Sequence, residues 1–547
     1  MADFHSRDHA TGKNGASVGI SGGPMEPMQQ TYLKPGQWDD LDPVAREGFT
    51  MNDQHDMQRM GKKQEFRRNF RFITTVGFTC CVMGTWEILM TSNTQALLAG
   101  GSAALFWSLC WCYTGQTFIV LSLAEMSSMA PTAGGQYHWV SEFAPQGSQR
   151  LLSYLSGWLS TISWQSIVAL DCYLVGTVIQ SLVIINDESY AATSWQATLL
   201  IFASVIGIGL FNMFGAKHLP LAEGLFVASH FFAFFPVIIV ILVLAPKTTP
   251  TKVFLTFSDN GAGWPTIAWA TLVGQVSAMF SVLGSDSVAH MAEEVQEAGS
   301  IVPRSMVWSF FLNIPFTFGM VVSYLFCITS LDDAVNDPTG YPFIYVFRQA
   351  TGSKSGTTGM TAVILLLLIM ITISSMASTS RQTFAFARDN GLPFSSWLGQ
   401  VHRKWHVPLN SIVFTMIFTC AVSLINIGST AAFNALLSLS TVALMATYLV
   451  SITCVLLRRI RGQYLPPARW SLGKLGLPIN ACALVYSCWS FFWSFWPNSY
   501  SINAENFNWA CVLFIGLMGV GSILYFTHAK KIYEGPVAIV EDRDKLR

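Results

Sequence analysis

The chain has 547 residues, of which 52% are hydrophobic and only 11% are charged, and its formal net charge at pH 7 is zero. Soluble domains usually carry about 25% charged residues, so this composition cannot cover a water-facing surface and excludes an ordinary soluble enzyme. The balanced charge gives no indication of nucleic-acid binding.

The first 65 residues are polar, are rich in Gly, Pro, Gln and Asp, and lack the apolar stretch of a signal peptide. We expect residues 1–65 to form a disordered cytoplasmic tail, because such a segment has little apolar surface to bury. Residues 66–530 are predicted to form the transmembrane domain, and residues 531–547 a short cytoplasmic tail.

Twelve apolar stretches reach the length of about 20 residues that a helix needs to cross a bilayer. They run approximately over 70–99, 103–130, 151–184, 193–214, 220–246, 264–290, 305–330, 358–380, 409–428, 430–457, 476–497 and 507–528. The composition and these stretches predict an all-α polytopic membrane protein with 12 transmembrane helices.

Lys and Arg are concentrated before the first stretch and in every second loop after it. The intervening loops carry only Lys247, Lys252, Arg348 and Lys354. Because cytoplasmic loops of membrane proteins carry an excess of Lys and Arg, both termini are predicted to be cytoplasmic.

Two of the predicted spans contain Gly and polar residues at their centres. In the first span these are Gly84 to Glu87, and in the sixth they are Gly284 to Asp286. Spans one to five and six to ten form two halves of similar length, each opening with such a span. Broken helices at corresponding positions of two repeats are typical of transporter binding sites. The candidate substrate-binding residues are Gly84, Thr85, Trp86, Glu87, Phe280, Gly284, Ser285 and Asp286.

Three segments carry a resemblance to a known family: LSLAEMSSMAPTAGGQYHWV, FSVLGSDSVAHMAEEVQEAGSIVPR and SRQTFAFARDNGLP. With them the chain resembles the amino acid–polyamine–organocation superfamily, and within it the fungal amino acid/choline transporter family. The resemblance implies a LeuT-like 5+5 inverted repeat plus two C-terminal helices, with the substrate held at the breaks of spans one and six. The Gly-Thr-Trp-Glu of span one departs from the small Gly/Ser-rich triplet of many relatives.

Four ionisable residues fall within predicted spans: Glu87, Asp171, His230 and Asp286. No Lys or Arg lies at a comparable depth, so the carboxyl groups are expected either to bind a cationic group or to take up protons. One hypothesis places Glu87 and Asp286 around a substrate amine, with Trp86 and Phe280 offering aromatic faces.

A second hypothesis assigns proton coupling to Asp171 or His230, although each also has a structural interpretation. Protons are the coupling ion that the resemblance implies. A sodium site remains an alternative, with oxygen ligands from Ser374, Ser375, Ser378 and Thr379.

Charged residues within the same motifs are expected at the cytoplasmic mouth, where their ion pairs would form a gate. The alternative is that they are solvated surface charges. These residues are Glu125, Glu293, Glu294, Arg304 and Arg388.

The leading interpretation is a proton-coupled permease that moves an amino acid, γ-aminobutyrate, choline or a related amine across the plasma membrane. One alternative is an exporter of a nitrogenous, alkaloid-like metabolite, and another is a non-transporting nutrient sensor. The sequence contains no H-E-x-x-H or phosphate-loop motif. The pattern G-x-S-x-G occurs only within residues 15–23 of the polar N-terminal segment and not as a strand-to-helix elbow, so we expect no enzyme. No metal or other cofactor is expected either, and the partners are the solute, the proton and the lipid bilayer.

Overall fold

The computed structural model describes residues 48–402, 405–428, 432–503, 506–533, 535 and 536. All of them belong to one compact unit, which spans residues 42–547. Helices dominate these ranges, and the two strands found there, β1 (Ala99–Gly100) and β2 (Ser258–Asp259), form a short antiparallel pair. An all-α architecture is therefore confirmed.

Eleven helical segments in the described ranges are long and apolar enough to cross a membrane, and each coincides with a predicted stretch. They are α2 with α3 (Phe72–Met83 and Thr85–Ser92), α5 (Gly101–Met129), α7 (Gln149–Asn186), α8 (Ser194–Phe214), α9 (Leu219–Leu244), α14 (Ala298–Cys327), α17 (Lys354–Arg388), α19 with α20 (Leu409–Ser423 and Ile425–Gly428), α21 (Ala432–Ile460), α22 (Gly476–Trp493) and α23 (Ala510–Leu524).

The remaining predicted stretch, 264–290, is divided into three short helices. They are α11 (Ile267–Gly274), α12 (Val276–Ser281) and α13 (Ser287–His290). The division explains why this stretch is not among the eleven long helices. The count of twelve spans and the inverted repeat stay predictions.

Short elements connect the long helices. They are α1 (Met51–Arg59), α4 (Thr94–Leu98), α6 (Gln136–Phe143), α10 (Pro250–Phe254), α15 (Leu331–Val335), α16 (Pro342–Thr351), α18 (Ser395–Leu398) and α24 (Lys530–Ile532), with the single turns η1 (Ala216–His218), η2 (Ala292–Glu294), η3 (Gly473–Leu475) and η4 (Tyr525–Ala529).

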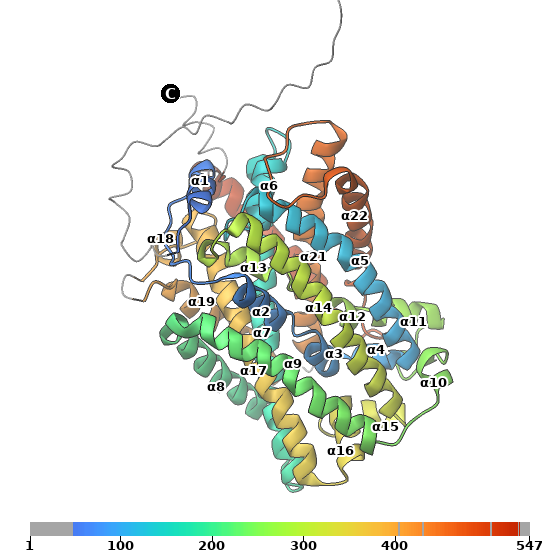
Figure 1. The fold of residues 1–547 in the computed structure, drawn as a ribbon. Coiled ribbons are helices and arrows are strands. Elements are labelled where there is room, and N and C mark those ends of the chain that lie inside the picture. The colour runs from blue at the N-terminus through green and yellow to red at the C-terminus, as the bar shows by residue number, and fades with distance from the viewer. Residues whose placement is uncertain (1–47, 403–404, 429–431, 504–505, 534, 537–547) are drawn as a thin grey trace, which may run out of the picture. The chain divides into compact units, whose positions relative to one another are not determined.

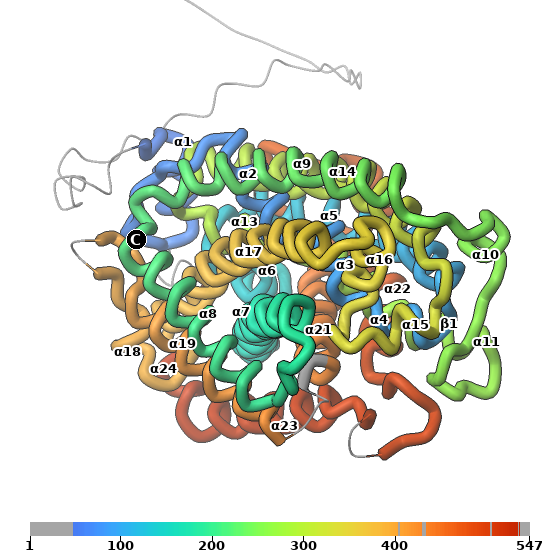
Figure 2. Tube along the Cα trace, turned by 90° about the horizontal axis from the view of Figure 1, so that it is seen from below, coloured from blue at the N-terminus to red at the C-terminus, as the bar shows by residue number. Residues whose placement is uncertain are grey.

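The long helix α7 lies in the interior of the bundle. It packs against α17, α21 and α8, and Figure 2 shows α17 and α21 on either side of it. Peripheral helices expose large apolar side chains, such as Leu221 (77% exposed) and Val243 (72%) on α9 and Ile515 (70%) on α23. An apolar outer surface of this kind requires lipid around it, so the long helices form a multi-pass membrane domain.

The structure corrects the predicted boundary of the N-terminal tail. Residues 48–65 were expected to be disordered, yet they include α1, whose first turn is capped by the side chain of Thr50. Met57 and Met60 are each 2% exposed, because they pack into the main apolar core. Residues 1–47 lie outside the described residues.

The described part of the C-terminal tail is also packed against the bundle. Tyr533 is buried, and its hydroxyl lies 2.6 Å from the Ser153 hydroxyl of α7. Residues 534 and 537–547 of the predicted tail lie outside the described residues.

Candidate functional site

The first span is interrupted at one residue, Gly84, as the sequence predicts. Gly84 has φ +40° and ψ +43°, a left-handed conformation that glycine adopts at little cost. A Cβ atom here would lie 2.3 Å from Cδ1 of Ile371 on α17. Both the conformation and the close approach of α17 therefore require glycine, and a new helix, α3, begins at Thr85.

The sixth span is interrupted over a longer stretch, as predicted at Gly284. Helix α12 ends at Ser281, and Gly284 has φ +92°, which ends the helical path before α13 begins. The amide of Ser287 then donates to the carbonyl of Gly284 over 3.0 Å and starts the next turn. Five residues, 282–286, thus lie between the two helical pieces.

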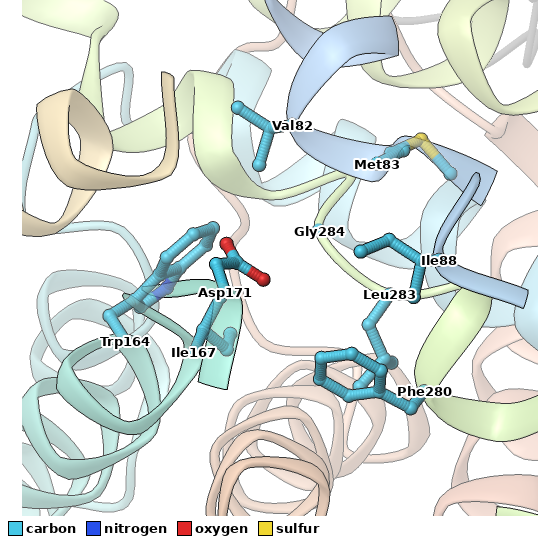
Figure 3. Close-up of a pocket in the computed structure, with 9 residues that line it drawn as sticks. All are labelled: Val82, Met83, Ile88, Trp164, Ile167, Asp171, Phe280, Leu283 and Gly284. Carbon is cyan, nitrogen blue, oxygen red and sulfur yellow. The ribbon is translucent and has the colours of Figure 1, made fainter. Parts of the chain in front are cut away.

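A small cavity lies between the two interruptions and α7 (Figure 3). Its volume is about 20 Å³, which is room for about one water molecule. The lining residues come from span one, span six and α7: Val82, Met83, Ile88, Phe280, Leu283, Gly284, Trp164, Ile167 and Asp171. Three of the residues singled out in the sequence, Phe280, Gly284 and Asp171, therefore meet here.

Asp171 provides the carboxyl group of this cavity. Its side chain points from α7 into the space between the interruptions (Figure 3), and the residue is only 3% exposed. Ser375 of α17 lies beside it. Among the described residues, Oδ2 has no hydrogen-bond partner and no Lys, Arg or His forms an ion pair with Asp171. A buried carboxyl group in this setting needs either a proton or a bound cation.

Glu87 does not line the cavity, because it is turned toward α9. Its Oε1 lies 2.6 Å from Nδ1 of His230, and Nε2 of His230 lies 3.0 Å from Oδ1 of Asn313 on α14. Thr85 points the same way and donates to Oδ1 of Asn313 over 3.1 Å. Trp86 packs edge-on against Phe234, with the ring centroids 5.9 Å apart.

Asp286 is held by a separate set of contacts. Tyr448 donates to its Oδ1 over 2.7 Å, and Gln136 donates to its Oδ2 over 2.5 Å. His290 lies 4.0 Å away, and Asp286 is fully buried. Its two oxygens are therefore occupied by neighbouring helices, and Asp286 and the buried Ser285 lie outside the residues that line the cavity.

Glu223 is a further buried carboxyl group, which is not among the residues predicted from the sequence. It lies on α9, and its Oε1 accepts a hydrogen bond of 2.7 Å from Ser374 of α17. The sequence pattern does indicate this position, because Glu223 precedes His230 by seven residues in an apolar run and therefore lies on the same face of the helix.

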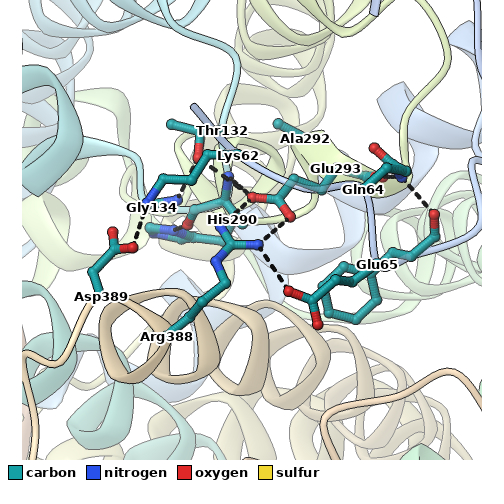
Figure 4. A network of polar contacts seen from close by, with 12 residues as sticks. Lys62, Gln64, Glu65, Thr132, Gly134, His290, Ala292, Glu293, Arg388 and Asp389 are labelled. Atoms are coloured by element: carbon teal, nitrogen blue, oxygen red, sulfur yellow. Dashed lines mark hydrogen bonds and ion pairs between the residues drawn. The ribbon is translucent and has the colours of Figure 1, made fainter. Parts of the chain in front are cut away.

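Ion pairs cluster at the end of the bundle that carries α1, η2 and the last turn of α17; we call this the charged end (Figures 1 and 4). Arg388 makes two bonds to Glu293, of 2.8 and 2.7 Å, and lies 3.9 Å from Glu65. Lys62 pairs with Asp389. The N-terminal segment is thereby tied to α17 and to the end of the sixth span.

The other predicted gate residues have different surroundings. Glu294 accepts a bond of 2.8 Å from Arg381, and Glu125 pairs with Arg459 and accepts a bond of 2.9 Å from Ser471. Arg304 is exposed. Four of the five predicted residues therefore take part in ion pairs at this end.

Electrostatics favour the charged forms in this cluster. Burial alone raises the pKa of Glu293, but the charge and hydrogen bonds of Arg388, the charge of Lys62 and the amide of Ala133 together outweigh it, so the net pKa is lowered. In the same way Lys62, Arg388 and His138 together outweigh burial and lower the pKa of Asp389. Both carboxylates are consequently ionised at neutral pH, and the pairs are intact there.

Long apolar helices around a small cavity at two helix breaks define a membrane transporter of the secondary type. The chain belongs to the amino acid permease family, whose family model matches residues 70–517. Members of this family are permeases and not enzymes.

Several curated relatives cover most of the chain. A putative amino acid/polyamine transporter of Macrophomina phaseolina is 29% identical, over 79% of this chain and 96% of its own length. The choline transporter of Saccharomyces cerevisiae is 26% identical, over 85% of this chain and 82% of its own. An amino-acid permease of Arabidopsis thaliana is 25% identical, over 88% of this chain and 96% of its own.

Proposed function

We propose that this permease is a proton-coupled transporter of a small solute with a positively charged nitrogen: an amino acid, γ-aminobutyrate, choline or a related amine. The observation that carries the proposal is the carboxyl group of Asp171, which faces the cavity without a cationic partner among the described residues. The relatives named as amino-acid, polyamine and choline transporters support the same class of solute.

The walls of the cavity suit such a nitrogen. Phe280 and Trp164 line it beside Asp171, and aromatic faces attract ammonium and quaternary ammonium groups. Helix α12 ends at the cavity, and the carbonyl groups of a helix C-terminus also favour a cation. The start of α3 offers the opposite end of a helix dipole to the carboxylate of an amino acid.

The proposed solute does not fit into about 20 Å³, so binding requires the cavity to widen. Movement of one group of helices around the breaks at Gly84 and Gly284 would open it to one side at a time. Ion pairs of the charged end, such as Glu293 with Arg388, join the end of the sixth span to α17. We propose that they act as the inner gate.

The charged end is proposed to face the cytoplasm, with both termini on that side and the protein in the plasma membrane. The excess of Lys and Arg in every second loop supports this orientation.

The test is uptake and efflux of a panel of amino acids, γ-aminobutyrate, choline and polyamines in a transporter-deficient yeast at two external pH values. We expect at least one nitrogen-bearing compound to be transported faster at the lower pH. If no compound moves although the protein reaches the plasma membrane, the proposed function is wrong. Efflux from cells that were first loaded with the compound, compared with uptake, decides between import and export.

The same assay tests the role of Asp171. Replacing it with Asn removes the negative charge while keeping the shape, so we expect at least a tenfold loss of uptake, equal to about 1.4 kcal/mol of binding free energy. The matched control is Asp187→Asn, since Asp187 follows the same helix but is exposed. Wild-type uptake in a properly localised D171N protein would contradict the assignment.

A further inference from the structure

Glu87 and His230 meet in a buried region between α3 and α9. Glu87 lies in the first turn of α3, directly after the break at Gly84, and His230 lies near the middle of α9. Glu87 is fully buried and His230 is 2% exposed. The aromatic rings of Trp86 and Phe231 flank the imidazole, at centroid distances of 6.1 and 4.9 Å. An unbalanced charge in such surroundings is costly.

The orientation of Asn313 fixes one proton of His230. Its Nδ2 donates to the backbone carbonyl of Ser309 over 3.0 Å, and a carbonyl group can only accept. Oδ1 must therefore be the atom that faces His230 and Thr85. Since this oxygen is also an acceptor, Nε2 of His230, at 3.0 Å, has to carry a hydrogen.

The contact of the other ring nitrogen, Nδ1, with Glu87 requires a second proton. A neutral ring with its hydrogen on Nε2 has a lone pair on Nδ1, and a carboxylate oxygen also offers only lone pairs. These atoms lie 2.6 Å apart, which is a hydrogen-bond distance and requires a proton between them. Glu87 and His230 are consequently either carboxylate and imidazolium or carboxylic acid and neutral imidazole. Both forms have zero net charge and hold the same number of protons.

We propose that Glu87 and His230 form a single proton-carrying dyad and that this conformation is its proton-loaded form. The inference rests on the proposed proton coupling and names the groups that perform it. The solute site and the proton site are then separate: Asp171 in the cavity takes the nitrogen of the solute, and the dyad behind α3 takes the proton.

Loss of the shared proton changes the balance of charge at the dyad. The proton leaves to water as H⁺, and no other covalent bond changes. The dyad then has one negative charge, and no Lys or Arg of the described residues forms an ion pair with Glu87. The other titratable groups near Glu87, the thiols of Cys80 and Cys81 on α2, supply no positive charge.

The remaining neighbours do not supply a positive charge either. Asn313 of α14 is uncharged. Tyr113 of α5, which donates a hydrogen bond of 2.8 Å to Thr317, offers no positive charge either. Glu223 lies two turns before His230 on α9 and is itself acidic. While Oδ1 of Asn313 keeps the hydrogen on Nε2, the deprotonated dyad has two lone pairs facing each other at Nδ1 and Oε1, and in our proposal the two side chains then separate.

Separation of the dyad has a direct consequence for the cavity. Glu87 belongs to α3, and the next residue, Ile88, lines the cavity. A shift of α3 away from α9 therefore moves the cavity wall, with Gly84 as the pivot. Proton release and the shape of the solute site are linked through a single short helix.

A test that needs no solute is infrared difference spectroscopy of the purified full-length protein between low and high pH. The wild type should show a carboxyl component and an imidazole component with one common midpoint, because the proton is shared. In E87Q both components should disappear together, since the Gln amide can donate to Nδ1 and leaves the ring neutral. The second variant, H230Q, serves if E87Q does not fold. It should likewise lose the common midpoint.

The matched control is Glu223→Gln, which removes another fully buried carboxyl group of α9 that bonds to Ser374 and not to the dyad. It should leave both components at the wild-type midpoint. An imidazole component that persists unchanged in E87Q would overturn the proposal, because His230 would then titrate independently of Glu87.

A second test uses proteoliposomes loaded with whichever of choline or γ-aminobutyrate the wild type transports, with the membrane potential clamped to zero. One proton per solute lets a gradient of one pH unit support about a tenfold accumulation. In E87Q we expect solute exchange to continue and accumulation to fall to about onefold. If E87Q accumulates the solute as strongly as the wild type does, the dyad proposal is wrong. If the wild-type protein transports neither compound, the proposed function is weakened, and the infrared experiment alone then tests the dyad.

Discussion

The three carboxyl groups that the sequence places at mid-span differ in what surrounds them. Asp286 accepts bonds from Tyr448 and Gln136, and Glu87 faces His230, whereas Asp171 faces a cavity. Their positions along the spans are readable from the sequence. Their roles are not readable from it. The helical period tells which residues share a face of one helix, but the neighbour that packs on each face comes from a distant part of the chain.

Gly84 is the residue on which both the proposed solute site and the proposed movement of α3 depend. In Gly84→Ala, the left-handed backbone costs about 1–2 kcal/mol, and the new methyl group displaces Ile371, which it would meet at 2.3 Å. We expect a lower melting temperature of the purified protein and strongly reduced uptake.

The control for this substitution is Gly207→Ala on α8, where an added Cβ meets nothing within 4 Å. It should leave the melting temperature unchanged or slightly raise it. Replacing Ile371 with Ala in the G84A background removes the clash but not the backbone strain, so partial recovery is expected. No difference between G84A and G207A would show that the break at Gly84 is not required.

At the scale of elements, α17 connects the parts of the proposed machinery. Two adjacent serines on it face different buried acids: Ser374 donates to Glu223, and Ser375 lies beside Asp171. The last turn supplies Arg388 to the ion pairs of the charged end. One helix therefore lies beside the cavity-lining Asp171 and also carries part of the proposed gate, which gives a physical route between the two sites.

The ion pair between Glu293 and Arg388 should make the stability of the charged end depend on pH. Because the pKa of Glu293 is lowered in the folded protein, its contribution is fully present above the ordinary carboxyl pKa. The contribution is lost as the pH falls through the lowered pKa. Glu293→Gln should destabilise the protein at neutral pH by on the order of 3 kcal/mol, since it leaves Arg388 without its buried partner.

Melting temperatures of wild-type and E293Q protein over a range of acidic to neutral pH measure this effect. The difference between the two proteins should be constant near neutrality and shrink on acidification. The exposed pair Glu188–Lys354 is the control, and Glu188→Gln should have almost no effect at any pH. A pH-independent gap between wild type and E293Q would contradict the ion-pair explanation.

At the scale of the whole molecule, the segment before the first span is hydrogen-bonded to the end of the sixth span at the charged end. The amide of Phe70 donates to the carbonyl of Glu294 over 3.1 Å, and the amide of Gln296 donates to the carbonyl of Phe70 over 3.0 Å. Arg68 is buried and donates to the carbonyl of Ala292 over 3.1 Å. If this end opens as proposed, we expect these contacts to separate together.

Hydrogen–deuterium exchange can follow that separation. In a Lys62→Ala, Asp389→Ala protein, which lacks the pair that ties the segment to α17, we expect faster exchange in residues 62–70 and 290–297 together. Exchange in the buried middle of α7 should stay unchanged. Faster exchange in only one of the two segments would show that they do not open together.

The sequence by itself determined the class of fold, the positions of eleven long apolar helices and the two breaks. It could do so because hydrophobic length and a mid-span glycine act locally along the chain. Only the tertiary structure decided that Asp171 faces the cavity, that Glu87 pairs with His230 and that residues 48–65 are packed and not disordered. Each of these contacts joins segments far apart in sequence, and no local pattern specifies which helix face meets which.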